Sequence, residues 1–200
     1  MRTRPALDVS DLPLHGDGTQ SVTWWGTLGF MLIEGTGFAL VIGVYLYLRS
    51  LASEWPLGAP PPGLLWGSLV TVWLLLTEVP NILIQRWAAA RDLRRVRWGL
   101  IVMTIAGIVP CVLRWYEFRT LWVMWDSNAY GSVVWLLLGL HATHLVTDLG
   151  DTVVLAALMW TRHGRNKRRF GDVQDNATYW HFVVLTWIPI YFIIYIVPRL

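Results

Sequence analysis

The sequence contains few charged residues. Lysine, arginine, aspartate and glutamate make up 14% of its 200 residues, and 55% of the chain is hydrophobic. Soluble domains carry about 25% charged residues, so this shortage of charge excludes an ordinary soluble domain. Five helices of about 20 apolar residues each would use roughly half of the chain. The 14 tryptophans fit the same class, because indole prefers the membrane boundary. The composition therefore predicts a small polytopic membrane protein.

Cysteine is nearly absent. The single cysteine, Cys111, allows no internal disulfide and no zinc or iron–sulfur site built on several thiolates. The net charge of +3 is too small to indicate nucleic-acid binding. The first 20 residues lack the apolar core of a secretory signal. We therefore expect the first membrane span to direct insertion.

Five apolar runs are long enough to cross about 30 Å of hydrocarbon as helices. These runs are Trp24–Leu48, Leu64–Ile84, Trp98–Phe118, Tyr130–Trp160 and Tyr179–Pro198. The proline-rich stretch Glu54–Gly63 and the basic stretch Arg162–Asp175 are expected to be loops. The predicted fold class is all-α, a polytopic bundle of five transmembrane helices over residues 23–200. A polar cytoplasmic segment at residues 1–22 precedes it.

Basic residues are distributed unevenly over the two sides that five spans define. Twelve of the 16 lysines and arginines fall in the N-terminal segment or in the second and fourth connectors, which share one side. The other four are Arg49, Arg114, Arg119 and Arg199. Because connectors rich in positive charge stay in the cytoplasm, we predict that the N-terminus is inside and the C-terminus outside.

Three glutamates in the predicted spans are candidate buried carboxylates, either proton-linked or structural. An ionisable group costs about 2.5–3.5 kcal/mol at the bilayer centre. Glu34 is expected to be a neutral carboxyl in a helix contact, with a direct functional role as the alternative. Glu78, two residues before Pro80, either marks a bent, hydrated helix or is satisfied by a neighbouring helix or a basic loop residue. Glu117 ends its span at the outer surface three residues after Arg114, where an exposed ion pair contributes little.

The fourth span carries the densest group of polar side chains. At 100° per residue, His141, His144, Asp148 and Asp151 share a stripe about 80° wide on one helix face. That stripe is expected to be a hydrogen-bonded seam between helices. The alternatives are that it binds lipid headgroups or forms part of a proton path. A metal site completed from other helices is a further alternative. His181, which opens the fifth span, is expected to join the same interhelical or lipid-headgroup polar seam. It lies at a different depth from His141, so these two are not expected to ligate a haem together.

Motifs of independent catalysis are also absent. The chain shows no nucleophile elbow, no phosphate-binding glycine loop and no Ser–His–Asp set. We therefore predict no catalytic residue and no metal ligand in this chain.

Several motifs together resemble subunit III of the haem–copper terminal oxidases over residues 24–198. The matching residues are Trp24, Trp25, Gly26, Glu34, Tyr45, Tyr47, Glu117, Phe118, Tyr130, Gly131, Ser132, Gly139, His141, His144, Trp180, His181, Phe182, Val183 and Trp187. Their joint order and spacing make the similarity more specific than any single motif. Val184 stands where the family's WHFVD motif has aspartate, and Asp148 and Asp151 are additional acids. The family's roles at these positions are therefore not carried over.

The resemblance implies a five-helix member that lacks the family's first helix pair. Such a subunit holds no cofactor of its own, packs against the catalytic haem–copper subunit and other oxidase subunits, and binds phospholipid. It supports assembly and proton uptake in aerobic electron transport, and haem and copper are expected in the partner. The resemblance also implies a bacterial-type inner membrane and places Glu34 at the family's buried carboxylate.

Three alternatives stay open at this point. One is an accessory subunit of a nitric oxide reductase. Another is an independent metal- or haem-binding membrane protein that uses His141, His144 and the two aspartates. The third is a small transporter or proton channel built on Glu34, Glu78 and the fourth-span stripe, which the lack of an internal repeat disfavours.

Overall fold

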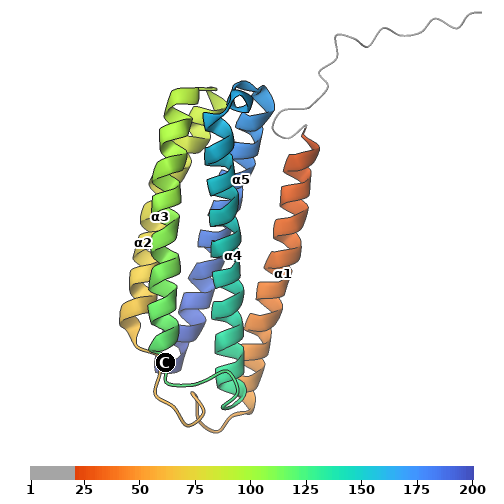
Figure 1. Ribbon diagram of the computed structural model, residues 1–200. Coiled ribbons are helices and arrows are strands. Elements are labelled where there is room, and N and C mark those ends of the chain that lie inside the picture. The colour runs from red at the N-terminus through yellow and green to blue at the C-terminus, as the bar shows by residue number, and fades with distance from the viewer. Residues whose placement is uncertain (1–20) are drawn as a thin grey trace, which may run out of the picture.

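The computed structural model describes residues 21–200, which form five long helices (Figure 1). They are α1 (Val22–Leu51), α2 (Leu64–Ala89), α3 (Leu93–Arg119), α4 (Ala129–Trp160) and α5 (Lys167–Tyr191). A 3-10 helix, η2 (Arg162–Arg165), precedes α5, and a π-helical segment, η3 (Phe192–Ile196), and a short 3-10 helix, η4 (Val197–Arg199), follow it. No strand occurs in the described residues, and the predicted all-α class is confirmed. The predicted polar segment at residues 1–22 lies, as far as residue 20, outside the described residues.

All five helices are long and apolar enough to cross a membrane, so the chain is a multi-pass membrane protein. The helices are longer than hydrocarbon alone requires. At 1.5 Å per residue, the 30 residues of α1 extend over about 45 Å, against about 30 Å of hydrocarbon. Their ends therefore project into the headgroup region on both sides.

The predicted loop over Arg162–Asp175 is wrong in its second half. The chain forms η2 and then enters α5 at Lys167. The side chain of Asn166 caps this helix by accepting a hydrogen bond from the Arg168 backbone nitrogen at 3.1 Å, which stabilises the first turn. Residues 167–175 are polar but contain no proline. A transmembrane helix can continue through such a segment because its polar side chains form hydrogen bonds with water outside the hydrocarbon.

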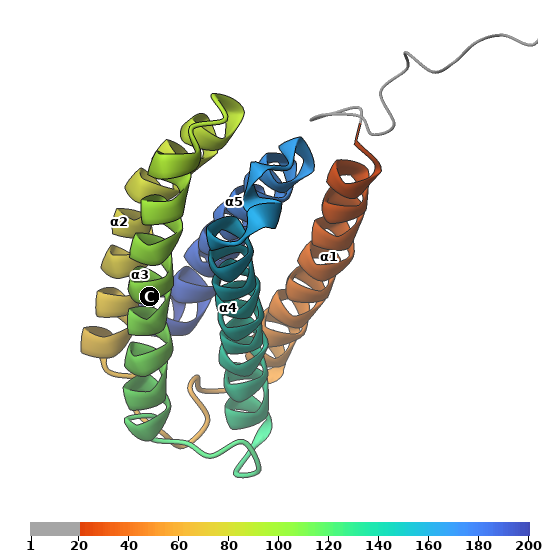
Figure 2. The same ribbon diagram turned by 45° about the horizontal axis from the view of Figure 1, so that its top comes forward.

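The five helices are arranged with α1 and the α2–α3 pair at opposite edges. Helices α4 and α5 lie between them, as both views show (Figures 1 and 2). Helix α1 packs against α4 and α5, and the buried residues it contributes are Phe38 and Tyr45. Most of its apolar side chains therefore face outward, toward lipid or another chain.

Two glycines bring helices unusually close together. A Cβ atom on Gly67 of α2 would lie 2.5 Å from the ring of Tyr195, and one on Gly99 of α3 would lie 2.5 Å from Ile84. Neither position leaves room for a larger side chain unless its neighbour moves. Small residues at helix contacts of this kind are typical of membrane bundles.

One end of the bundle, which we call the basic end, is where α1 begins, α2 turns into α3, and η2 joins α4 to α5 (Figure 1). Basic residues at this end include Arg94, Arg95, Arg162 and Lys167. The C-terminus lies at the opposite end (Figure 1). That the basic end faces the cytoplasm is the prediction of the positive-inside rule.

Candidate functional site

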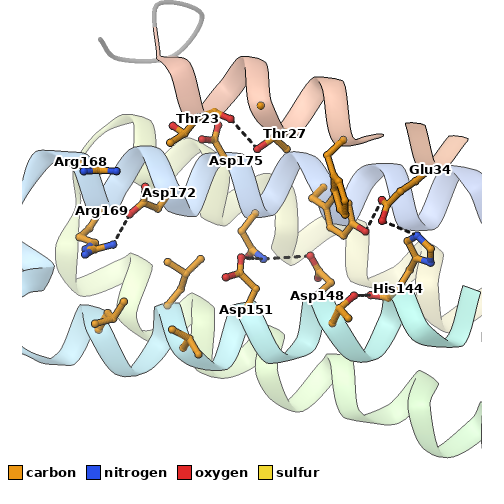
Figure 3. Close-up of a pocket in the computed structure, with 18 of the residues that line it drawn as sticks. Thr23, Thr27, Glu34, His144, Asp148, Asp151, Arg168, Arg169, Asp172 and Asp175 are labelled. Carbon is orange, nitrogen blue, oxygen red and sulfur yellow. Dashed lines mark hydrogen bonds and ion pairs between the residues drawn. The ribbon is translucent and has the colours of Figure 1, made fainter. Parts of the chain in front are cut away.

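A pocket of about 730 Å³ opens between α1, α4 and α5 toward the basic end (Figure 3). Its acidic lining residues are Glu34, Asp148, Asp151, Asp172 and Asp175, and its basic ones are His144, Arg168 and Arg169. An apolar part of the wall is formed by Phe30, Val154, Leu155 and Leu158. The pocket has the size of a small-ligand site and combines many carboxylates with hydrocarbon.

Glu34 connects three helices at the end of the pocket far from Arg168 (Figure 3). Tyr179 of α5 donates its hydroxyl proton to Glu34 Oε2 at 2.8 Å, and Nε2 of His144 lies 3.0 Å from Oε1. His144 Nδ1 is 2.6 Å from the carbonyl oxygen of Leu140, which can only accept, so Nδ1 carries a proton. A further proton can reside on His144 Nε2 or on Glu34, and the net charge of the pair is the same in both cases.

Asn176 of α5 connects the two aspartates of α4. Its amide nitrogen donates to Asp148 Oδ1 at 3.3 Å and to Asp151 Oδ2 at 3.2 Å. Its oxygen accepts a hydrogen bond from Thr152 at 3.2 Å, which fixes the orientation of the amide. Asp148 is buried and Asp151 is exposed. The amide therefore satisfies one oxygen of each carboxylate.

His141 shares a helix face with His144 but belongs to a different network. Its Nε2 lies 3.0 Å from the carbonyl oxygen of Val183, and its Nδ1 lies 3.1 Å from the guanidinium of Arg114. A carbonyl only accepts and a guanidinium only donates, so His141 is neutral with its proton on Nε2. Both ring nitrogens are in use, which leaves no lone pair for a metal.

The ion pair that the sequence suggested between Arg114 and Glu117 is present, but it is buried and not exposed at the outer surface. Their relative exposures are 2% and 1%, and Arg114 NH1 lies 2.5 Å from Glu117 Oε2. Tyr195 donates to the other carboxylate oxygen, and the guanidinium lies over the ring of Trp187, 4.0 Å from its centroid. The pair is buried because the C-terminal part of the chain packs over the end of α3, a long-range contact that the periodicity of α3 does not reveal.

Glu78 and His181 form a third polar contact, between α2 and α5. Nδ1 of His181 contacts Glu78 Oε2. The side-chain amide of Asn81 lies 3.4 Å from His181 Nε2 and donates to the carbonyl oxygen of Ala177 at 2.9 Å. Of the alternatives that the sequence left open for Glu78, contact with a neighbouring helix is the one observed. Helix α2 continues through Pro80.

The fourth-span stripe is thus divided between two places. His144, Asp148 and Asp151 line the pocket with Glu34, whereas His141 joins Arg114 outside it. The sequence analysis missed the α5 residues that complete the pocket, which are Asp172, Asp175, Asn176 and Tyr179. They occupy positions i, i+3, i+4 and i+7 of α5, which is the spacing of one helix face. That spacing was the available signal, and the predicted loop concealed it.

Donors for a metal are not gathered in the described part of the chain. No group of three histidine, cysteine, aspartate or glutamate side chains within residues 21–200 could hold a metal ion. Both nitrogens of His141 contact protein partners, so His141 does not serve as a metal ligand in this arrangement.

These features define a class of protein, a five-helix membrane bundle whose ionisable groups pair across helices. The chain is 24% identical over 180 residues to cytochrome c oxidase subunit 3 of Thermostichus vulcanus, with 87% of each chain covered. It is 28% identical over 184 residues to a probable cytochrome c oxidase subunit 3 of Mycobacterium tuberculosis, with 86% of each covered. Against cytochrome c oxidase subunit 3 of Drosophila melanogaster the identity is 27% over 181 residues, covering 86% of this chain and 68% of the relative. No protein-family model matches the chain.

The predicted resemblance to subunit III of the haem–copper oxidases is confirmed by these relatives. They carry that name in bacteria and in an insect, and the similarity extends over most of the chain. They support an accessory subunit of a cytochrome oxidase, a membrane protein of the respiratory chain.

Proposed function

We propose that the chain is a non-catalytic accessory subunit of a respiratory haem–copper terminal oxidase in a bacterial-type inner membrane. Its direct partner is the catalytic subunit, which holds the haem and copper, and further oxidase subunits complete the assembly. The chain supports assembly, phospholipid binding and proton uptake in aerobic electron transport. Residues 1–22 are proposed to lie on the cytoplasmic side, and residues 23–200 form the membrane domain. Similarity over 86–87% of the chain to proteins named cytochrome c oxidase subunit 3 supports this proposal.

The Glu78–His181 contact is the observation that favours a protein partner in the membrane. The two side chains are 21% and 28% exposed, and Glu78 Oε1 has no hydrogen-bond partner in the described part of the chain. Leu185 and Ile188, one and two turns further along α5, are 63% and 47% exposed. Ionisable groups facing lipid are unfavourable by several kcal/mol. A transmembrane helix of the catalytic subunit would cover this polar pair and the apolar side chains beside it.

The pocket supports the proposed roles in lipid binding and proton uptake. Residues of α4 that line it, including Thr143, Thr147 and Asp151, are exposed, so the pocket is accessible from outside the bundle. Glu34 and His144, at the end of the pocket far from Arg168, can share one proton, and the net charge of the pair is the same whichever partner carries it. A site that combines access with a shared proton is suited to proton uptake.

Purification of the tagged chain from its native membrane tests the partnership. We expect a haem- and copper-containing subunit to copurify, and the gas that the complex consumes, oxygen or nitric oxide, identifies the terminal acceptor. Leu185→Trp should lower the recovered haem several-fold, because the larger ring obstructs the proposed interface. Ile105→Trp, a matched change at a side chain 61% exposed on α3, should not. Wild-type preparations without haem would contradict the proposal.

Glu34 variants test the role of the pocket within the complex. Glu34→Ala should shorten sustained turnover and leave the haem spectrum intact, because the haem lies in the partner. Glu34→Gln keeps an acceptor for the Tyr179 hydroxyl but carries no transferable proton. If Glu34→Gln shortens sustained turnover as much as Glu34→Ala, turnover depends on the proton that Glu34 carries. If Glu34→Gln turns over like the wild type, turnover depends on the hydrogen bond to Tyr179. Loss of haem in either variant would argue against the proposed role.

A further inference from the structure

The pocket contains more negative than positive charge. Arg169 pairs with Asp172 at 2.7 Å, and His144 pairs with Glu34 at 3.0 Å. When these two pairs are set aside, the other charged lining residues are Asp148, Asp151, Asp175 and Arg168. The pocket thus has two acids in excess. A cationic group entering it would compensate this charge.

Among the described residues that line the pocket, one carboxylate has a buried oxygen without a hydrogen-bond partner. Asp148 is 2% exposed, and its Oδ1 accepts a hydrogen bond from Asn176. Its Oδ2 is buried without a hydrogen-bond partner in the described residues, although the residue lines the pocket. A buried polar atom left unpaired is energetically unfavourable. A donor placed in the pocket would remove that cost.

Other acceptors on α4 line the same pocket. Asp151 is exposed toward the pocket, and one of its carboxylate oxygens, Oδ2, accepts from Asn176. The hydroxyl of Thr147 is used as a donor to Thr143 and His144 carbonyl oxygens, so its lone pairs remain to accept. Positions 147, 148 and 151 lie within about 100° of one another on the helix. Together they offer several acceptors on one wall.

We infer that the pocket binds a primary ammonium group between Asp148 and Asp151. An ammonium carries one positive charge and three N–H donors, so it compensates one of the two excess acids and can donate to the acceptors described above. A divalent metal fits less well, because no three suitable side chains come together within residues 21–200. Both aspartates are additions to the pattern of the resembled family, so this site distinguishes the present chain.

The rest of the pocket is complementary to a phosphate and to hydrocarbon. Arg168 and Arg169 lie at the end nearer the basic end of the bundle (Figure 3), and guanidinium groups bind phosphate well. Phe30, Leu155 and Leu158 provide apolar wall. An ethanolamine phospholipid therefore fits as the source of the ammonium, and a free amine shares the same chemistry. This inference rests on the lipid binding proposed above and specifies its headgroup.

A series of lipids that differ only in N-methylation tests the site in the wild-type chain. The full chain is purified in detergent and incubated with phosphatidylethanolamine, its N-methyl and N,N-dimethyl derivatives, or phosphatidylcholine of identical acyl chains. Bound lipid is then counted by native mass spectrometry. We expect retention to fall stepwise as N–H donors are lost, by about tenfold over the series. Equal retention of the first and last lipid would overturn the inference.

Isosteric variants locate the site. Asp148→Asn and Asp151→Asn should each reduce phosphatidylethanolamine retention toward the level of phosphatidylcholine. Asp126→Asn, the same change at an exposed acid between α3 and α4, should leave it unchanged. Circular dichroism and gel filtration establish that the variants are folded, and the methylation series needs no variant. Unchanged retention in both pocket variants would overturn the assignment to these aspartates.

Free ethanolamine distinguishes the two sources of the ammonium. Displacement of phosphatidylethanolamine by millimolar ethanolamine, with loss of this effect in Asp148→Asn, supports a site that accepts any primary amine. Failure of ethanolamine to compete, with the methylation series intact, supports the lipid as the source. These measurements use the isolated chain, so they are independent of whether a haem-containing subunit copurifies.

Discussion

At the scale of single residues, the bundle contains two kinds of charged pair with different surroundings. His144 and Glu34 meet in a pocket that opens to the outside, and a proton can reside on either partner. Arg114 and Glu117 are enclosed, with exposures of 2% and 1%. His141 and Trp187 contact the guanidinium, and Tyr195 donates to the carboxylate. The first pair suits proton handling, and the second suits the attachment of α3 to α4 and α5.

Removal of one member of the enclosed pair should be more harmful than removal of both charges. Arg114→Met leaves the Glu117 carboxylate buried without its cation and should lower the free energy of unfolding by about 3–5 kcal/mol. Adding Glu117→Gln removes the unpaired charge and should restore part of that loss. Equilibrium unfolding in mixed micelles measures both. If the double variant is as unstable as the sum of the two single ones, the pair is not coupled as described.

At the scale of helices, apolar length predicted the five elements and most of their ends to within five residues, but it missed the start of α5. All five runs became helices, because hydrocarbon forces the backbone to satisfy its own hydrogen bonds. Hydrophobicity stops at the headgroups, however, whereas α5 begins 12 residues before Tyr179, at Lys167. The capping side chain of Asn166 was the local signal for that start. Because the sequence analysis assigned residues 162–175 to a loop, it missed the helix face that carries Asp172, Asp175 and Asn176.

The close contact at Gly67 makes a prediction about how α2 packs. Gly67→Ala would place a methyl group against the ring of Tyr195, and relieving the clash should cost about 1–3 kcal/mol. Gly43→Ala is the control, because nothing lies within 4 Å of its added Cβ and alanine favours a helix. Thermal unfolding in detergent should therefore separate the two variants. Equal stability would show that Tyr195 moves aside freely.

At the scale of the whole molecule, the charge asymmetry predicts the orientation in the membrane. Cys111 is the single cysteine, so a Cys111→Ala background allows single-site labelling. Ser53→Cys, between α1 and α2, should react with a membrane-impermeant maleimide in cells whose inner membrane is intact and whose outer envelope has been opened to the reagent. His163→Cys, in η2 at the basic end, should react only after the membrane is permeabilised. The reverse pattern would place the N-terminus outside.

The candidate site was predictable in part. Glu34, His144, Asp148 and Asp151 could be singled out because ionisable groups in apolar spans are rare. Their grouping could not, since it depends on which helices are neighbours. His141 shows this directly: it lies on the same stripe as His144, yet Arg114, 27 residues away, determines its tautomer.

The position of α1 has a consequence for how the protein is made. Helix α1 packs against α4 and α5, which are synthesised after α2 and α3, and the Tyr179 partner of Glu34 lies 145 residues downstream. The α2–α3 hairpin can pair as soon as it is inserted, whereas α1 must wait for α4 and α5. Contacts so distant in sequence form late. Helix α1 therefore joins the bundle after the α2–α3 hairpin has paired, and the pocket beside it is completed only once α5 has been synthesised.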